Sequence, residues 1–299
     1  MFRTTKMSAA IAVCCAVAGV GLVGCSDSSD DDAKSPSSPP AQAAETFTGT
    51  QKFDIEGHAV NVSCTGTAAP GKPVIMLMPG HGDGLEAMAA LQTALSQSDR
   101  VCAYDRLGEG ASDKPDGPQD FASSGKILTG VLDKVVGSTP VVLAGHSMGG
   151  LIAARYAPDH QDRVKGLVLM DATSPTAGAD IVAGIPESAT GDAAGLRAET
   201  ISIYQGENNE RLVVADGEVR SAGDIPVEVL QHGKQYFVEA VPEYGQALEQ
   251  GWTAGQNKWL GVSTRSTLTT ATNSGHYIYV DEPDLALQAI RRVTQAAAG

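Results

Sequence analysis

The sequence predicts an α/β fold with a mostly parallel sheet and helices on both faces. Short apolar runs, as expected for strands, alternate along the chain with stretches of helical spacing. Residues 73–78 form a continuous apolar run, which is typical of a strand buried on both faces. Residues 145–149 read Gly-x-Ser-x-Gly between a predicted strand and a predicted helix, a position typical of a sharp strand-to-helix turn.

Each element is predicted from its own pattern. Residues 47–55 and 59–64 alternate between apolar and polar and should pair antiparallel around a turn at 56–58. The later strands are predicted at 73–78, 100–104, 141–144, 164–170, 225–230 and 267–271. Helical spacing is found at 85–96, 124–136, 149–157, 236–259 (in two pieces) and 284–297, where Pro283 opens the last helix.

Residues 171–224 interrupt this alternation. The segment is rich in Gly, Ala, Ser and Pro and contains one plausible helix near 196–204. A long insertion at the carboxyl edge of a parallel sheet usually covers the ligand crevice. We therefore expect a small cap over residues 173–223.

The first 45 residues are expected to lie outside the fold. Arg3 and Lys6 precede an apolar stretch that is short for a membrane span, as in a signal peptide covering residues 1–24. The stretch ends Leu-Val-Gly-Cys at Cys25, which resembles a bacterial lipobox, so we expect cleavage before Cys25 and acylation of its sulfur. An ordinary signal peptide or a retained membrane helix are the alternatives.

Residues 25–45 are acidic and proline-rich, which predicts a flexible tether between the lipid and the folded body. The expected location is therefore a membrane surface, with the protein lipid-anchored on the extracytoplasmic side.

Composition and motifs also exclude several classes of function. The formal net charge of −14 argues against a nucleic-acid partner, which would require a basic surface. The chain contains no His-Glu-x-x-His, no Cys-x-x-Cys and no dinucleotide-binding fingerprint, and His81-Gly82-Asp83 is too short a cluster for a metal site. We therefore expect neither a metal nor a cofactor.

Ser147 is the candidate nucleophile. Glycines at 145 and 149 leave room for a tight turn that lifts the hydroxyl clear of the backbone, and the amide groups of the next helix would face an anion forming there. The alternative is a glycine-rich turn in which the serine only caps the helix.

Four segments together resemble the α/β-hydrolase superfamily over residues 46–299. They are an oxyanion loop at 77–82, a Tyr-Asp-x-x-Gly-x-Gly-x-Ser turn at 104–112, the nucleophile elbow at 145–149, and a histidine loop with its closing helix at 274–283. The resemblance implies an eight-stranded, mostly parallel twisted sheet. With the lipobox, it suggests a secreted bacterial esterase-like lipoprotein.

The resemblance assigns His276 as the base, because it lies in the loop after the last strand and comes last in the order Ser, acid, His. The acid of most members follows the seventh strand, where this chain has no carboxylate before Glu239 and Glu243. Some members carry it after the sixth strand, where Asp171 stands. Asp171 is the preferred candidate, and the two glutamates remain alternatives.

The other five histidines are assigned to other roles. His146 is expected to point away from the nucleophile, and His81 to matter through its backbone. Structural or solvated roles are expected for His58, His160 and His232.

Further roles follow from the same resemblance. The oxyanion donors should be the backbone N–H groups of His81 and Met148, and Asp105 should bind backbone amides. In the family's strand order the second and fourth strands are neighbours, which brings Cys64 and Cys102 within disulfide reach. The resemblance therefore implies a Cys64–Cys102 disulfide, with two buried thiols as the alternative.

The sequence as a whole therefore predicts a serine hydrolase that cleaves small-molecule carboxylic esters through an acyl-enzyme intermediate. The same triad could act on amide, thioester or carbon–carbon bonds, or in cofactor-free perhydrolysis. A catalytically inactive, membrane-tethered binding module is the alternative from another class.

Overall fold

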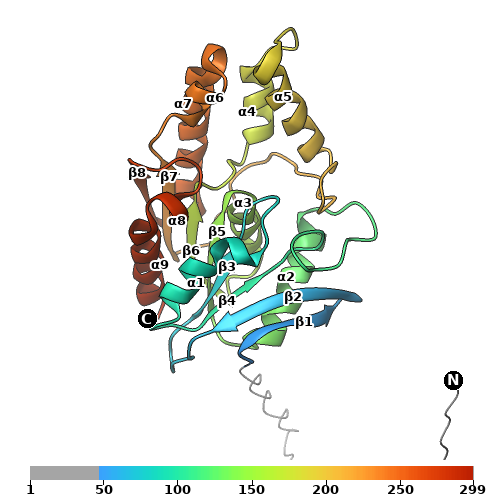
Figure 1. The fold of residues 1–299 in the computed structure, drawn as a ribbon. Helices are drawn as coiled ribbons and strands as arrows, with labels where there is room; N and C mark the ends of the chain where they lie inside the picture. Colours follow the sequence, from blue (N-terminus) through green and yellow to red (C-terminus); the bar gives the residue numbers. More distant parts are fainter. Residues whose placement is uncertain (1–46, 299) are drawn as a thin grey trace, which may run out of the picture. The chain divides into compact units, whose positions relative to one another are not determined.

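The computed structural model describes residues 47–298 and has a mixed sheet at its centre (Figure 1). Eight strands lie in the order β1-β2-β4-β3-β5-β6-β7-β8. β2 is antiparallel to both of its neighbours, and all other pairs are parallel. The predicted α/β fold with an eight-stranded, mostly parallel sheet is confirmed.

The elements follow the predicted order, with ends that differ by a few residues. The strands are β1 (Gly49–Ile55), β2 (His58–Thr65), β3 (Val74–Met78), β4 (Val101–Tyr104), β5 (Val141–His146), β6 (Val164–Met170), β7 (Pro226–His232) and β8 (Arg265–Ala271). The α-helices are α1 (Ala89–Leu95), α2 (Phe121–Val135), α3 (Ser147–Tyr156), α4 (Ala177–Gly184), α5 (Gly191–Tyr204), α6 (Tyr236–Ala240), α7 (Pro242–Lys258), α8 (Ile278–Asp281) and α9 (Pro283–Ala297). Short 3₁₀ turns are η1 (Leu85–Met88), η2 (Ala157–Asp159) and η3 (Trp259–Val262).

Local chemistry explains where individual elements begin and turn. Helix α2 begins three residues before the prediction because Asp120 and Ser123 form a capping box, each side chain accepting a hydrogen bond from the other's backbone N–H. The β1–β2 hairpin turns at Glu56 and Gly57, both with positive φ, as two-residue hairpin turns require.

The sheet separates two layers of the core. Along β3, Val74, Met76 and Met78 pack on the side of α2 and α3, whereas Ile75 and Leu77 pack on the side of α1 and α9. Because successive side chains of a strand point to opposite faces, a fully apolar strand serves both layers.

The predicted disulfide between Cys64 and Cys102 is present. The two residues are directly opposite each other in the antiparallel ladder of β2 and β4. A bond between residues 38 apart in sequence should stabilise the fold by about 3–4 kcal/mol through the chain entropy of the unfolded state.

Two helices, α4 and α5, lie in the insertion after β6, where the sequence indicated only one. α4 has the glycine-rich sequence AGADIVAG, which carries little helical signal by itself. It forms because Ile181 and Ile185, at its end, pack in a small apolar cluster with Phe237 and Leu248 of α6 and α7. Helices α4 and α5 precede β7 in the chain, and α6 and α7 follow it. Both pairs extend beyond the carboxyl ends of the strands (Figure 1).

The predicted signal peptide, Cys25 and the tether lie outside the described residues, so the lipid anchor stays a prediction. Within residues 47–298, the helices are too short or too polar for any of them to traverse a bilayer.

Candidate active site

Ser147 stands at the sharp turn between β5 and α3. Its φ of 49° lies in the left-handed region, which a non-glycine residue adopts only when its surroundings require it. A Cβ at Gly149 would collide with the carbonyl oxygens of Met78 and Pro79, so the turn packs directly against the end of β3. Close packing of backbone on backbone thus holds Ser147 in the strained conformation.

Asp171 and His276 are joined by a short hydrogen bond, from ring Nδ1 to Oδ2 at 2.6 Å. Asp171 follows β6 and is fully buried, whereas the His276 side chain, in the loop after β8, is 25% exposed. Burial disfavours the charged carboxylate, but hydrogen bonds from His232 and His276 outweigh it and hold the pKa of Asp171 well below its usual value. Asp171 is therefore a carboxylate anion that accepts a hydrogen bond from the Nδ1–H group of His276.

Ser147 and His276 line the same cavity of about 260 Å³, together with Gly80, His81, Met148 and Thr173. No hydrogen bond joins the Ser147 hydroxyl to His276 within the described residues. The hydroxyl instead lies 3.5 Å from the hydroxyl of Thr173. Catalytic hydrogen bonds are often long or unformed before substrate binds.

The helices α4, α5 and α7 supply a mostly apolar wall of this cavity. It consists of Ala177 and Ile181 from α4, Thr200, Ile203 and Tyr204 from α5, and Trp252 from α7. The indole of Trp252 also donates a hydrogen bond to Asp171 Oδ1 at 2.9 Å. Neither Thr173 nor Trp252 was predicted as a site residue, because both lie in segments without a motif.

The backbone N–H groups of His81 and Met148 are both available at this cavity. Met148 is the second residue of α3 and has no acceptor within the helix. His81 N–H has no acceptor in the described part of the chain, and Arg106 donates hydrogen bonds to the carbonyls of Pro79 and Gly80, at 2.5 and 2.8 Å. The Gly80 carbonyl and the His81 N–H belong to one trans peptide group, in which C=O and N–H point in opposite directions. Because Arg106 binds the carbonyl, the His81 N–H points away from the guanidinium.

Arg106 is itself held by Glu210, in the chain segment between α5 and β7. Nε and Nη2 of Arg106 donate to the two carboxylate oxygens of Glu210 at 2.7 and 2.8 Å, and both side chains are buried. Burial raises the pKa of a carboxyl, but Arg106 outweighs this effect and lowers the pKa of Glu210 to about 2. The ion pair thus ties the insertion to the oxyanion loop.

The side chain of His81 belongs to the same network, in addition to the role expected for its backbone N–H. Its Nδ1 lies 3.6 Å from carboxylate oxygens of both Glu109 and Glu210, and contact with Glu210 raises the pKa of His81. These three groups could in principle ligate a metal ion. However, Arg106 already binds both oxygens of Glu210, and the raised pKa of His81 favours a proton on the ring nitrogen that a metal would need, so the donor set fits an ion-pair network.

His146 lines the same cavity, although no hydrogen bond joins its ring to Ser147 within the described residues. Its ring packs against that of His276 at 4.6 Å between centroids, and its Nε2–H donates to the His276 carbonyl at 3.0 Å. Burial, together with the charge of His276, lowers the pKa of His146 to about 3, so the ring is neutral. His146 therefore supports the histidine loop.

The alternative acids lie away from His276. Glu239 is on α6 and Glu243 on α7, and both are exposed without a bond to His276. The expectation for Asp105 is confirmed, since its two oxygens accept the N–H groups of Leu85 and Ala111 at 2.6 and 2.8 Å.

Of the three histidines assigned structural or solvated roles, two contact residues outside the candidate site and one contacts Asp171. His58 faces Asp116 at 3.7 Å, and His160 stacks on Tyr156, with ring centroids 3.6 Å apart. His232 instead reaches the candidate site, because its Nδ1 lies 2.9 Å from both oxygens of Asp171.

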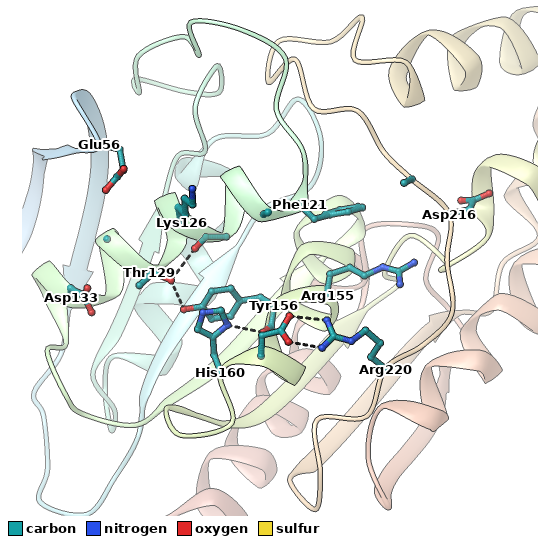
Figure 2. Close-up of a pocket in the computed structure, with 15 residues that line it drawn as sticks. Glu56, Phe121, Lys126, Thr129, Asp133, Arg155, Tyr156, His160, Asp216 and Arg220 are labelled. Atoms are coloured by element: carbon teal, nitrogen blue, oxygen red, sulfur yellow. Dashed lines mark hydrogen bonds and ion pairs between the residues drawn. The ribbon is translucent and has the colours of Figure 1, made fainter.

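A larger cavity, of about 680 Å³, lies apart from these residues, between α2, the end of α3 and the segment 215–220 (Figure 2). Arg220 and Asp159 face each other in a two-bond ion pair at one side, and Tyr156 and His160 stack beside them. None of the predicted catalytic residues lines this cavity, so its size does not make it the active site.

Comparison with known proteins identifies the family. Residues 73–278, more than half of the chain, match the sequence profile of the alpha/beta hydrolase fold. The chain belongs to the α/β-hydrolase family.

This hydrolase is similar in structure to a probable hydrolytic enzyme from Pseudomonas aeruginosa (TM-score 0.60, 19% identity, 81% of this chain and 92% of that chain). It is also similar to a thermophilic esterase from Thermogutta terrifontis (TM-score 0.56, 19% identity, 84% of this chain and 100% of that chain). Likeness at this level of identity shows the fold.

Among curated sequences, this hydrolase is 34% identical over 131 residues to a poly(3-hydroxyalkanoate) depolymerase from Ectopseudomonas oleovorans. The match covers 42% of this chain and 44% of that protein. The chain thus spans less than half the length of this relative.

Proposed function

We propose that the protein is a serine hydrolase that cleaves small carboxylic esters. The hydrogen bond between His276 Nδ1 and Asp171 Oδ2 carries this proposal, because His276 and Ser147 line the same cavity. It leaves Nε2 of His276 as the basic nitrogen, because the carboxylate fixes the proton on Nδ1. An esterase and a depolymerase among the similar proteins support ester chemistry.

In the proposed reaction, Ser147 Oγ attacks the ester carbonyl while Nε2 of His276 takes its proton. The carbonyl oxygen becomes an oxyanion that accepts hydrogen bonds from the N–H groups of His81 and Met148. Collapse breaks the bond to the alcohol oxygen, which takes the proton from His276, and leaves an acyl-serine. Water then repeats the sequence, releases the acid and restores the hydroxyl.

The cavity supports a preference for short acyl chains. Its volume of about 260 Å³ lies below the roughly 300–1,000 Å³ of pockets that enclose drug-sized ligands. Ile181, Ile203 and Trp252 offer apolar contact to an acyl group but no charged partner. We therefore propose esters of small aliphatic acids as substrates.

A panel of nitrophenyl esters with acyl chains from acetate to dodecanoate tests this function. We expect kcat/KM to be highest for the short chains, and a fluorophosphonate probe to label the wild type but not Ser147→Ala. Folded wild type that neither hydrolyses an ester nor takes the probe would favour the inactive binding module. Labelling without ester turnover would favour amide, thioester or carbon–carbon substrates.

Arg106→Lys tests the oxyanion geometry. A lysine ammonium cannot bind both oxygens of Glu210 in a fork and hold the carbonyls of Pro79 and Gly80 at the same time. The His81 N–H should lose its direction, and we expect kcat to fall by about 10- to 100-fold with a smaller change in KM. Steady-state kinetics on the folded variant measure this effect.

Arg163→Lys is the matched control for Arg106→Lys. Arg163 pairs with Asp133 and the Gly137 carbonyl away from the cavity, so kcat should stay near that of the wild type. An unchanged kcat in Arg106→Lys would show that the His81 N–H does not depend on this guanidinium.

A further inference from the structure

Asp171 is shared by two histidines. His232 is the last residue of β7, next to β6 in the sheet, and only 7% of it is exposed. Its ring Nδ1 lies 2.9 Å from both oxygens of Asp171, and its backbone N–H donates to Oδ1 at 3.0 Å. His276 binds the same carboxylate from the cavity side at 2.6 Å.

The other nitrogen of His232 faces a second carboxylate. Nε2 lies 2.8 Å from Oε2 of Glu249 on α7, whose Oε1 accepts the N–H of Phe237 at 2.8 Å. A neutral imidazole has one donor and one acceptor, and an ionised carboxylate only accepts. Two carboxylates on opposite sides of the ring therefore require one additional proton, held by His232 or by Glu249.

The surroundings of His232 favour the imidazole as the site of that proton. Burial opposes a charge on His232, but hydrogen bonds and charges from Asp171 and Glu249 outweigh it and raise the pKa of His232. The other groups packed here are Tyr236, with its ring 4.7 Å away, and the uncharged indole of Trp252. Burial raises the pKa of Tyr236 well above its usual value, so its hydroxyl stays neutral.

Solvent can reach this pair without passing the serine. His232 and Glu249 line a separate cavity of about 470 Å³, whose other walls are mostly glutamine, asparagine and threonine side chains. It shares no lining residue with the cavity that contains Ser147. Protons can thus exchange at His232 while a substrate occupies the active site.

We propose that His232 is a positively charged positioning residue that holds Asp171 and takes a share of its negative charge. A positive charge on this side of the carboxylate opposes a second positive charge on His276, which makes His276 a weaker base. Glu249 keeps His232 charged. This inference rests on the proposed function, in which His276 acts as the base.

The test is the double variant His232→Asn/Glu249→Gln. An asparagine amide can still donate to Asp171 but carries no charge, and the glutamine prevents a buried, unpaired carboxylate. Without the positive charge, His276 should bind its proton more readily. The acid limb of kcat/KM against pH should move to higher pH by about 0.5–1.5 units.

Gln250→Ala is the matched control, since Gln250 lines the same cavity without a bond to His232 or Glu249, and its pH profile should equal that of the wild type. A double variant that loses thermal stability but keeps the wild-type pH profile would leave His232 a merely structural residue and overturn the proposal.

A second readout needs no turnover. In the Ser147→Ala background, NMR titration of the His276 ring should show the same upward movement when the double variant is introduced. If the His276 titration moves in this background while the wild type, with Ser147 intact, hydrolyses no ester, the proposed function fails and the role of His232 stands. If ester turnover depends on Ser147 but the His276 titration does not move, the proposed function stands and the role of His232 fails.

Discussion

Replacing Ser147 with alanine is expected to lower kcat for a short nitrophenyl ester by about 10⁴–10⁶-fold. The methyl group cannot attack a carbonyl, so no acyl-enzyme forms, and any residual rate comes from the oxyanion donors acting on water. The wild type should show an initial burst of nitrophenol if deacylation is slower than acylation, and Ser147→Ala should show none.

Two further variants separate chemistry from folding. Ser147→Gly should be equally inactive yet more stable by about 1 kcal/mol, because glycine adopts the φ of 49° without strain. Ser96→Ala removes a hydroxyl at the end of α1, which bonds only a neighbouring carbonyl, and should keep full activity. Turnover that survives in both variants at position 147 would exclude this serine as the nucleophile.

Asp171→Asn is expected to lower kcat by about 10³–10⁴-fold. An asparagine amide that faces the ring nitrogen would favour the His276 tautomer with its proton on Nε2, which cannot accept the serine proton. Asparagine is the most conservative replacement, because Asp171 has a φ of 45° and asparagine tolerates this region. Steady-state kinetics at the optimum pH of the wild type measure the loss.

The alternative acids supply the matched controls for Asp171→Asn. Glu239→Gln and Glu243→Gln alter exposed carboxylates on α6 and α7, and each should retain wild-type kcat. A large loss in either variant, with activity kept in Asp171→Asn, would move the acid to the helix after β7.

Much of the candidate site was predictable because its signals are local. Gly145, Ser147 and Gly149 identify the elbow through the turn that they require. The order of the strands followed from the family resemblance, which also predicted that Cys64 and Cys102 face each other in β2 and β4.

Helix α4 was missed because its sequence alone is a weak helix former. It is stabilised by the apolar side chains of α6 and α7, more than 50 residues later in the chain. Packing between insertions therefore decided secondary structure that local patterns could not predict.

By itself, the sequence determined the alternation of strands and helices and the tight turn at Ser147, since each depends on neighbours along the chain. The candidacy of His276 followed from the family resemblance. Only the tertiary structure decided that His276 binds Asp171 rather than Glu239, and that Asp171 also binds His232. These contacts join residues from 61 to 105 positions apart, and they exist because β6, β7 and β8 are adjacent and end at the same edge of the sheet. A hydrogen bond over such a separation depends on where the strands place the side chains, which no local pattern records.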